Sequence, residues 1–361
     1  MVKKRDLLLV TRYPIEVNYK KGKLSMKLDV YAFGSALVDV QLSVADSVLE
    51  KIGAVKGNMA LTERSRQEEV LGLLMGENLS CLDRLAAKAN MAAGGSAANT
   101  VYGIAQLGGT AALCGKVARD AFGDFYINNM RQSGVVFNGR MVAGMTGTCI
   151  ILISDDAQRT MLTCLGVSSE IDSADIDQEQ LTSSRYLYLE GYLFDSRVAT
   201  ETMLEAMHLA KRNGVQIAFT ASDAFCISRH KDLFVQLLGQ VDLLFCNAQE
   251  AQALSGTGSN DEAIKVLSEK CPGIALTDGA SGSLLHFGGT TFPVKPHAVT
   301  PVDTTGAGDS YAAGLLYGLT SGCPLEKSGE IASLFSSRVV AQLGPRLAGD
   351  IKGAIAALAK G

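Results

Sequence analysis

The sequence predicts an α/β fold: a doubly wound, largely parallel sheet with helices on both faces, joined to a small β-rich lid. Short apolar runs rich in β-formers alternate along the chain with longer segments suited to helices, and this order is typical of a parallel sheet covered on both faces. Glycine-rich turns follow several of the runs. At 361 residues the chain also exceeds the length at which one hydrophobic core stops growing, so a smaller attached piece is expected.

Apolar runs of β-type define the expected strands. The first lies in LDVYAFGSALVDV at 28–40, a buried run with a glycine turn. The later runs are bounded by turn residues, as short buried strands are. They are TAALCGKV at 110–117, RYLYLEG at 185–191, VQIAFTA at 215–221, VDLLFCN at 241–247 and GIALTD at 273–278, followed by extended chain at 290–299.

Helices are expected between these runs. The stretch AAGLLYGL near the C-terminus is small and apolar, as a buried helix should be. The predicted helices are residues 99–109, 120–133, 196–213, 231–240, 261–270, 309–321 and 325–342.

Two segments do not follow the alternation: residues 41–62 and 138–166. Both show period-two alternation of apolar and polar residues, with turn signals such as Asp155-Asp156. Each leaves the sheet after a strand and returns to it. We expect them to form the lid, which would close over a ligand and exclude water; a pair of surface hairpins is the alternative.

Residues 1–25 are interpreted as an N-terminal extension to a main domain at 26–361. The extension is rich in lysine, and Met26 opens the first core run. An extra edge strand, a disordered arm or an upstream start would each explain it. Its apolar stretch of about four residues is too short for a secretory signal.

Composition favours a cytoplasmic enzyme that acts on a small molecule. A net charge of −4 and a pI near 5.7 argue against a nucleic-acid partner, which requires a basic surface. No apolar run reaches the roughly 18 residues of a membrane span. The eight cysteines are dispersed and the four histidines share no ligand spacing, so buried thiols in a reducing compartment are expected rather than a metal cluster.

The segment PVDTTGAGDS at 301–310 carries the strongest chemical signal. Gly306, Ala307 and Gly308 precede a predicted helix, where unpaired backbone amides and the helix dipole favour an anion. Asp309 lies in the first turn, beside any anion held there. A carboxylate next to a phosphate suits proton abstraction from a hydroxyl during phosphoryl transfer. A glycine-rich helix cap is the alternative.

A second glycine motif, MAAGGSAANT at 91–100, also precedes a predicted helix. Gly94 and Gly95 allow the backbone to approach a ligand closely. Asn99 offers a side-chain donor and acceptor one turn later. Two such motifs in one chain favour the phosphoryl-transfer site over an ordinary helix cap.

Together, GGSAANT and DTTGAGD resemble the two signature regions of the ribokinase-like (PfkB) family of carbohydrate and nucleoside kinases. Three further motifs match in order and spacing: GKVARDAFG at 115–123, NAQE at 247–250 and LTDGASGSLL at 276–285. The likeness runs from about Met26 to the C-terminus. SDDAQRTMLTCLG, YLEGYLFD and SDAFCISRH resemble a bacterial adenosine-kinase-like subgroup. The resemblance implies a ribokinase-like fold.

The resemblance also implies roles in catalysis and metal binding. Asp309 would be the general base, and residues 306–308 would form the anion hole. Asn247 and Glu250 would orient Mg²⁺, with Glu250 acting through water because Mg²⁺ retains several waters. A solvated helix start is the alternative for these two residues.

For the nucleotide, the resemblance implies contacts from Thr277, Gly279 and Gly282, although a plain β-turn explains them nearly as well. Lys116 has no phosphate-loop context, because GxxxxGK[ST] is absent. We therefore interpret Lys116 as structural.

On the acceptor side, Asp39 is expected at the end of the first strand, where it would take paired ribose hydroxyls. A carboxylate in an otherwise apolar run is costly to bury without partners, which favours a ligand role. Arg159 resembles a lid arginine that steadies phosphate charge, with an exposed hairpin arginine as the alternative. The residues expected to complete the grip on the acceptor are Gly94, Gly95, Ser96 and Asn99.

These observations predict a kinase that uses ATP and Mg²⁺ to phosphorylate a primary hydroxyl of a ribose-containing acceptor, adenosine or a related nucleoside. Ser35 stands where many adenosine kinases have Asn, so a sugar kinase acting on ribose, fructose or a modified hexose is the alternative. A non-catalytic nucleotide-binding protein is a distant third. A monovalent cation is a further candidate cofactor, and the chain is expected to be a monomer or homodimer without nucleic-acid or membrane partners.

Overall fold

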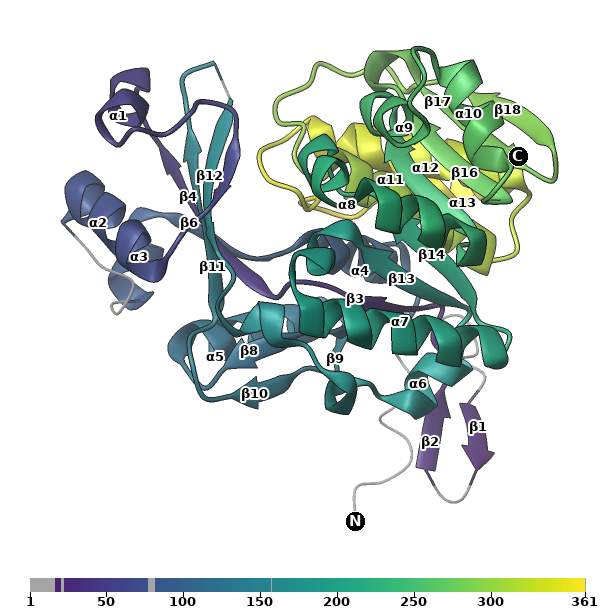
Figure 1. The fold of residues 1–361 in the computed structure, drawn as a ribbon, viewed down its shortest axis with the longest axis horizontal. Helices are drawn as coiled ribbons and strands as arrows, with labels where there is room; N and C mark the ends of the chain where they lie inside the picture. Colours follow the sequence, from purple (N-terminus) through teal and green to yellow (C-terminus); the bar gives the residue numbers. More distant parts are fainter. Residues whose placement is uncertain (1–16, 21–22, 77–81, 157, 361) are drawn as a thin grey trace.

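A nine-stranded sheet forms the centre of the molecule (Figure 1). The computed structural model describes residues 17–20, 23–76, 82–156 and 158–360. The strands from β16 to β9 are parallel, whereas β17 and β18 add an antiparallel edge. The predicted α/β fold is confirmed. In spatial order the strands are β18 (Thr290–Val294), β17 (Ser283–Phe287), β16 (Gly273–Thr277), β15 (Leu243–Asn247), β14 (Gln216–Thr220), β13 (Tyr186–Glu190), β3 (Val30–Phe33), β7 (Ala111–Cys114) and β9 (Val136–Phe137).

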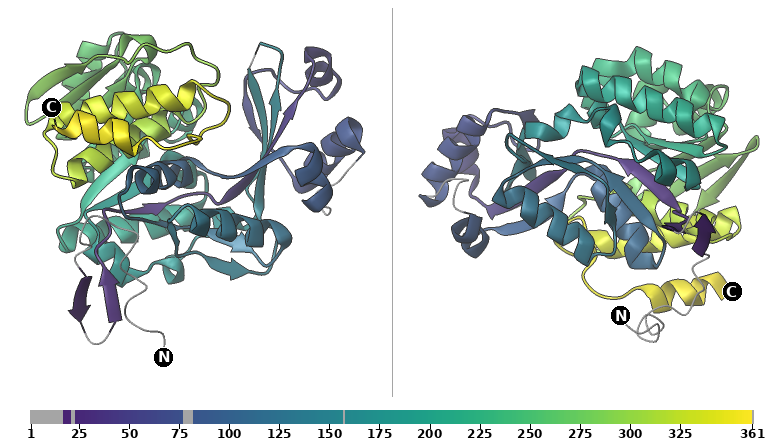
Figure 2. Two further views of the ribbon diagram at one scale, coloured as in Figure 1. Left: turned by 180° about the vertical axis from the view of Figure 1, so that it is seen from behind. Right: turned by 90° about the horizontal axis from the view of Figure 1, so that it is seen from below.

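Helices cover both faces of this sheet, as the right-hand view in Figure 2 shows. Successive residues of β3 alternate between the two cores: Val30 and Ala32 pack on one side, Tyr31 and Phe33 on the other. The first face carries α4 (Ser96–Leu107), α5 (Ala121–Gln132), α11 (Ala307–Thr320), α12 (Leu325–Val340) and α13 (Lys352–Lys360). The second carries α6 (Gln178–Ser183), α7 (Arg197–Arg212), α8 (Ala224–Leu237), α9 (Ala248–Ser255) and α10 (Asn260–Ser268).

The helix predicted at 231–240 was placed too late in the chain. Helix α8 begins at Ala224, because the Asp223 carboxylate caps it by accepting from the Cys226 N–H. His230 has non-helical backbone angles and marks a kink inside α8. The prediction therefore captured only the part of the helix beyond the kink. Helices α6, α9 and α13 lie outside the predicted ranges.

A smaller five-stranded sheet projects from the main body (Figure 1). The chain enters it through Gly34, Ser35 and Ala36, so the first predicted strand is two strands in two different sheets. The helices beside this sheet lie partly beyond residue 62. Its strands, in spatial order, are β5 (Met59–Leu61), β12 (Arg159–Cys164), β11 (Gly147–Ile153), β4 (Leu37–Ser43) and β6 (Asn90–Gly94), and its helices are α1 (Asp46–Lys51), α2 (Arg64–Met75) and α3 (Leu82–Lys88).

Two short strand pairs complete the fold. Strand β8 (Lys116–Ala118) pairs with β10 (Arg140–Val142) in parallel. Strands β1 (Val17–Lys20) and β2 (Lys23–Met26) form an antiparallel pair within the N-terminal extension. Residues 1–16 of that extension lie outside the described residues.

Helices α4 and α11 pack closely because small residues meet at their contact. A Cβ atom added at Gly103 of α4 would lie 2.7 Å from the Ala313 Cβ of α11 and 2.8 Å from the Phe335 ring of α12. Both neighbours are buried. The N-termini of α4 and α11, which carry the two glycine motifs, are therefore held side by side.

We predict that Gly103→Ala lowers the free energy of unfolding by about 1–3 kcal/mol, because the added methyl group overpacks this contact. The matched control is Gly72→Ala in α2, where a Cβ would meet nothing within 4 Å. That change should instead stabilise the helix by roughly 0.5–1 kcal/mol. Urea unfolding of both variants measures the difference; equal effects would show that the α4–α11 contact tolerates a wider separation.

Candidate active site

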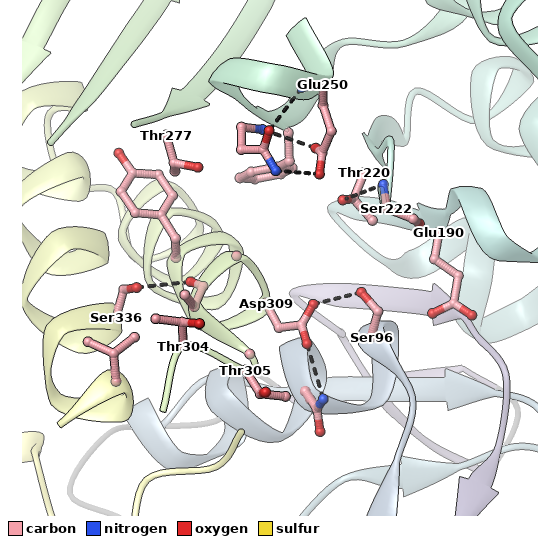
Figure 3. Close-up of a pocket in the computed structure, with 18 of the residues that line it drawn as sticks. Ser96, Glu190, Thr220, Ser222, Glu250, Thr277, Thr304, Thr305, Asp309 and Ser336 are labelled. Atoms are coloured by element: carbon pink, nitrogen blue, oxygen red, sulfur yellow. Dashed lines mark hydrogen bonds between the residues drawn. The ribbon is translucent and has the colours of Figure 1, made fainter. Parts of the chain in front are cut away.

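The two sheets enclose a cavity of about 940 Å³ at the carboxyl ends of the parallel strands. Ligands collect at this edge of such sheets. Its floor contains the last residues of four neighbouring strands, Glu190, Thr220, Asn247 and Thr277. Figure 3 shows Glu190, Thr220 and Thr277 around Asp309. Residues of the small sheet form the opposite wall.

The anion hole predicted at residues 306–308 opens into this cavity. Gly306 is the N-cap of α11 with a φ of 73°, and a Cβ there would lie 2.6 Å from Pro345. Glycine is therefore required for both conformation and space. A Cβ at Gly308 would meet nothing within 4 Å, so the first turn of the helix is open on this side. The Ala307 N–H donates to the Thr304 carbonyl at 3.2 Å.

Asp309 lies at the centre of the site. Its carboxylate accepts hydrogen bonds from Ser96 Oγ at 2.6 Å and Asn99 Nδ2 at 3.1 Å (Figure 3). Burial raises the pKa of Asp309 to about 6, against the opposing effects of these two hydrogen bonds and of the Arg346 charge. The carboxylate is thus ionised at pH 7 and above, yet basic enough to accept a proton.

The structure places Ser96 and Asn99 in contact with Asp309, a contact that the sequence did not indicate. Gly95, the N-cap of α4, has a φ of 102°, and a Cβ there would lie 2.1 Å from the Ser35 carbonyl oxygen. Only glycine fits this position. The second glycine motif therefore joins the surroundings of Asp309 to the turn that leads into the small sheet.

Asp39 belongs to the small sheet, which corrects its predicted place at the end of the first strand. It is the third residue of β4, and its side chain is buried. A Cβ at Gly94 would lie 2.3 Å from its Oδ1, so Gly94 makes room for the carboxylate. Burial raises the pKa of Asp39 to about 7, opposed by the charges of Arg346 and Arg159. The sequence indicated the glycine turn at Gly34 but not that the chain passes there from one sheet into another.

Glu190 was not predicted, yet it lies in the same cavity at the end of β13. Its two oxygens accept from the backbone N–H groups of Ser35 at 2.7 Å and Ala97 at 2.8 Å. Burial raises its pKa to about 7. Glu190 therefore connects the turn into the small sheet with the start of α4. The only signal for it in the sequence is a charged residue ending an apolar strand.

Asn247 and Glu250 form a reciprocal cap at the start of α9. Asn247 Oδ1 accepts from the Glu250 N–H at 2.9 Å, and the Glu250 carboxylate accepts from the Asn247 N–H at 3.0 Å and from Asn247 Nδ2 at 2.6 Å. Burial raises the pKa of Glu250 to about 7. Both residues line the cavity. Because the cap already uses both carboxylate oxygens, the pair fits an outer contact to hydrated Mg²⁺ better than direct ligation.

The described residues contain no cluster of three or more His, Cys, Asp or Glu side chains able to hold a metal ion alone. Magnesium usually reaches such sites with substrate phosphates and several waters. Glu250, a buried carboxylate that lines the cavity, is compatible with that mode of binding.

The residues expected near the nucleotide also line the cavity. Thr277 ends β16, and the turn that follows contains Gly279, with a φ of 51°, and Gly282, with a φ of 93°. A Cβ at Gly282 would lie 2.3 Å from the Val294 carbonyl oxygen. Strand packing thus accounts for Gly282 independently of any ligand contact.

Arg159 is buried, which excludes the exposed-hairpin alternative; its side chain is 9% exposed. Its guanidinium forms an ion pair with Asp303, which also accepts from the Thr305 and Gly344 N–H groups. Arg159 therefore links the small sheet to the loop before α11. It does not line the cavity itself.

Lys116 lies away from the cavity, in agreement with its structural interpretation. Its ammonium group contacts Asp172 and Asp175, each at 2.9 Å. Of the seven described cysteines, none forms a disulfide and six are buried. No helix among the described residues is long and apolar enough to span a bilayer.

Ser222 is a second residue that the sequence did not indicate. It follows β14, lines the cavity, and has a φ of 72°, the sole positive value at a non-glycine residue within the described ranges. Its buried hydroxyl has no hydrogen-bond partner among the described residues. Strained backbone of this kind occurs often at functional sites, and no sequence pattern encodes it.

Comparisons with known proteins agree with this geometry. Residues 70–350 match the pfkB family carbohydrate kinases. The ribokinase of Mus musculus is 31% identical over 234 residues, which cover 62% of this chain and 70% of that protein. Two crystal structures are also similar: a probable sugar kinase from Rhizobium etli CFN 42 (33% identity, TM-score 0.84) and the adenosine kinase from Sinorhizobium meliloti (37% identity, TM-score 0.83). Each match covers 92% of this chain and 99% of the other.

We predict that Asp309→Asn stabilises the protein above about pH 6, because the folded state then no longer holds an ionised buried carboxylate. The raised pKa of about 6 means that the folded state binds more protons than the unfolded state between about pH 4 and pH 6. The advantage of the variant should therefore disappear as the pH falls toward 4.

Thermal unfolding between pH 4 and pH 8 measures this difference. At pH 8 the melting temperature should rise by at least about 1 °C, the effect of about 1 kcal/mol in a chain of this size. The exposed Glu205→Gln is the control, with a change below about 0.5 kcal/mol. A variant that melts lower than the parent at pH 8 would contradict the assignment of Asp309 as a destabilising, functional charge.

Proposed function

The chain belongs to the pfkB family of carbohydrate kinases, and from this premise we propose that it transfers the γ-phosphate of ATP to a primary hydroxyl of a ribose-containing acceptor, adenosine or a related nucleoside. The family assignment makes the protein a kinase with an alcohol group as acceptor. Its relatives include a ribokinase and an adenosine kinase. The identity of the acceptor goes beyond the family assignment and is the specific part of our proposal.

The proposal of a nucleoside as acceptor is supported by the side chains of the small sheet that line one wall of the cavity. Its exposed side chains are mainly apolar, whereas Asp39 is the carboxylate on the same wall. A flat nucleobase buries apolar surface against such a wall, while a free sugar would leave hydroxyls facing it without partners. The wall-forming residues of this sheet are Leu37, Asp39, Met59, Leu61, Cys149, Ile151, Met161 and Thr163.

The mechanism follows from the residues on the floor. The acceptor oxygen attacks the γ-phosphorus, its proton passes to the Asp309 carboxylate, and the bond to the ADP oxygen breaks. The amides of Gly306 and Gly308 would donate to the transferring phosphoryl group, where negative charge is held, while the Ala307 N–H donates to the Thr304 carbonyl in this structure. Asp39 orients the acceptor by its hydroxyls. Bound Mg²⁺ would neutralise phosphate charge, with Asn247 and Glu250 as its outer contacts.

A sugar kinase of the same family is the second candidate, and Ser35 favours it. Ser35 lines the cavity and is buried, and its short side chain replaces the amide expected to contact a base. Glu190 accepts from the Ser35 N–H and so holds this residue in place.

A coupled assay with ATP and a panel of nucleosides and sugars tests the proposal, with Asp309→Asn as the inactive control. We expect the highest kcat/KM for adenosine and a loss of about 10⁴-fold for 2′-deoxyadenosine, since a site that binds a hydroxyl rejects analogues lacking it. Asp39→Asn should raise the KM for the acceptor more than it lowers kcat. Equal use of the two nucleosides would refute the ribose contact, and activity on hexoses alone would establish the sugar kinase.

We also predict that Glu250→Gln weakens the use of Mg·ATP by about 10- to 100-fold, as loss of an outer metal contact does, while the KM for the acceptor changes little. Removing the charge acts on the metal side of the cavity alone. Initial rates across a Mg²⁺ titration measure the effect. Asn260→Ala, a neighbouring helix start outside the cavity lining, serves as the control, and an unchanged Mg²⁺ dependence would reduce Glu250 to a helix cap.

A further inference from the structure

Arg346 lies in the loop after α12 and reaches the back of the catalytic centre. Its Nε donates to Asn99 Oδ1 at 3.0 Å, and its Nη1 donates to Asn129 Oδ1 at 2.8 Å. The guanidinium also stacks on the Tyr102 ring, 4.6 Å from its centroid. Burial lowers the pKa of Arg346 from its usual value. The guanidinium is thus largely desolvated, and its hydrogen bonds hold it in a specific position between α4 and α5.

The partners of this arginine are neutral. Among the described residues, Arg346 forms no ion pair, although a guanidinium withdrawn from water is usually paired with a carboxylate. Two amide oxygens and an aromatic face satisfy its geometry but do not neutralise its charge. The nearby acidic groups on which the charge acts are Asp309 and Asp39.

Asn99 connects the arginine to the catalytic base. Its Oδ1 accepts from Arg346, and its Nδ2 donates to the Asp309 carboxylate at 3.1 Å. The opposite orientation of this amide would set its oxygen against the carboxylate and its NH₂ group against the guanidinium. Arg346 therefore fixes which end of Asn99 faces Asp309, and its charge polarises the amide in the direction that strengthens the bond.

The other titratable groups whose pKa the Asp309 charge raises come from several elements and are acidic or phenolic: Asp39 of β4, Glu190 and Tyr188 of β13, Tyr192 beyond β13 and Glu250 of α9. Ser96 and Asn99 of α4 donate hydrogen bonds to it. Arg346 is the cation that acts on Asp309. Without it, the base would lie among negative or potentially negative groups.

We propose that Arg346 is a positioning residue for the phosphoryl transfer: through Asn99 it aligns the Asp309 carboxylate toward the acceptor hydroxyl. This inference rests on the proposed role of Asp309 as the general base. It deepens that proposal by naming the group that sets the pH range in which the base works.

A purely structural role is the competing explanation, because Arg346 joins α4 to α5 and its neighbour Pro345 packs against Gly306. The two roles differ in what they change. A structural tether alters stability and the amount of active enzyme, whereas a charge acting on the base alters the pH at which the base becomes protonated.

The test compares Arg346→Gln, Arg346→Lys and Asn129→Ala in the full chain. For Arg346→Gln we expect kcat with Mg·ATP and the best acceptor to fall by about 10- to 100-fold, and the acidic limb of its pH profile to move up by about 0.5–1 pH unit. Arg346→Lys should restore the position of the limb but not all of kcat, since the charge remains while the planar fork is lost. Asn129→Ala removes the tether to α5 and should leave the limb in place.

A second measurement tests the proposal without activity. The stabilising effect of Asp309→Asn, followed against pH by thermal unfolding, reports the protonation of Asp309 directly. In an Arg346→Gln background, that effect should still begin at about pH 4, but it should level off at a higher pH and reach a larger value than in the parent, because the folded-state pKa is raised further. This result would support the role of Arg346 even if no acceptor in the panel were phosphorylated. Failure of the Arg346 proposal can therefore be distinguished from failure of the proposed function.

Unchanged pH midpoints in both measurements, with a lower melting temperature for Arg346→Gln and Asn129→Ala alike, would overturn the proposal. Arg346 would then be a link between helices and nothing more.

Discussion

The close contact between α4 and α11 is the constraint on which the site depends. Gly103 lets the backbone of α4 approach Ala313 of α11, and a larger side chain at either residue would separate the helices. The contact aligns two helix N-termini from opposite ends of the chain. One supplies Asp309 and the glycine turn proposed as the anion hole, and the other supplies Ser96 and Asn99, which donate hydrogen bonds to Asp309.

Around this contact, the cavity holds acidic side chains at a cost in free energy. Burial raises the pKa of four of them, Asp39, Glu190, Glu250 and Asp309. Like charges in a poorly hydrated cavity repel one another, so these carboxylates destabilise the folded protein.

Two arginines oppose this negative charge from different directions. Arg159 comes from the small sheet and pairs with Asp303 in the loop before α11, so the position of that sheet is coupled to the loop that forms the anion hole. Arg346 comes from the loop after α12 and acts through neutral partners. The positive charges of Arg159 and Arg346 thus act on the buried carboxylates of the cavity: both lower the pKa of Asp39, and Arg346 lowers that of Asp309. Neither arginine belongs to the parallel sheet.

Local patterns in the sequence determined the elements and the chemistry of the two glycine motifs. Apolar runs such as 215–221 and 241–247 form the predicted strands, because the alternation of burial is a property of adjacent residues. Asp309 and residues 306–308 were identified because a helix start, its donors and its carboxylate lie within a few positions of one another. The family resemblance added Asn247 and Glu250 to these candidate site residues, and both line the cavity as expected.

Tertiary structure decided the rest, because the decisive contacts join residues far apart in the chain. Ser96 and Asp309 are separated by 213 positions, and Asn99 and Arg346 by 247. No local pattern relates such pairs. The sequence likewise could not place Asp39 in the small sheet, since whether a strand continues or crosses into a second sheet depends on packing at a three-residue turn. Residue type and spacing fixed what chemistry the chain could perform, while helix packing decided which side chains meet to perform it.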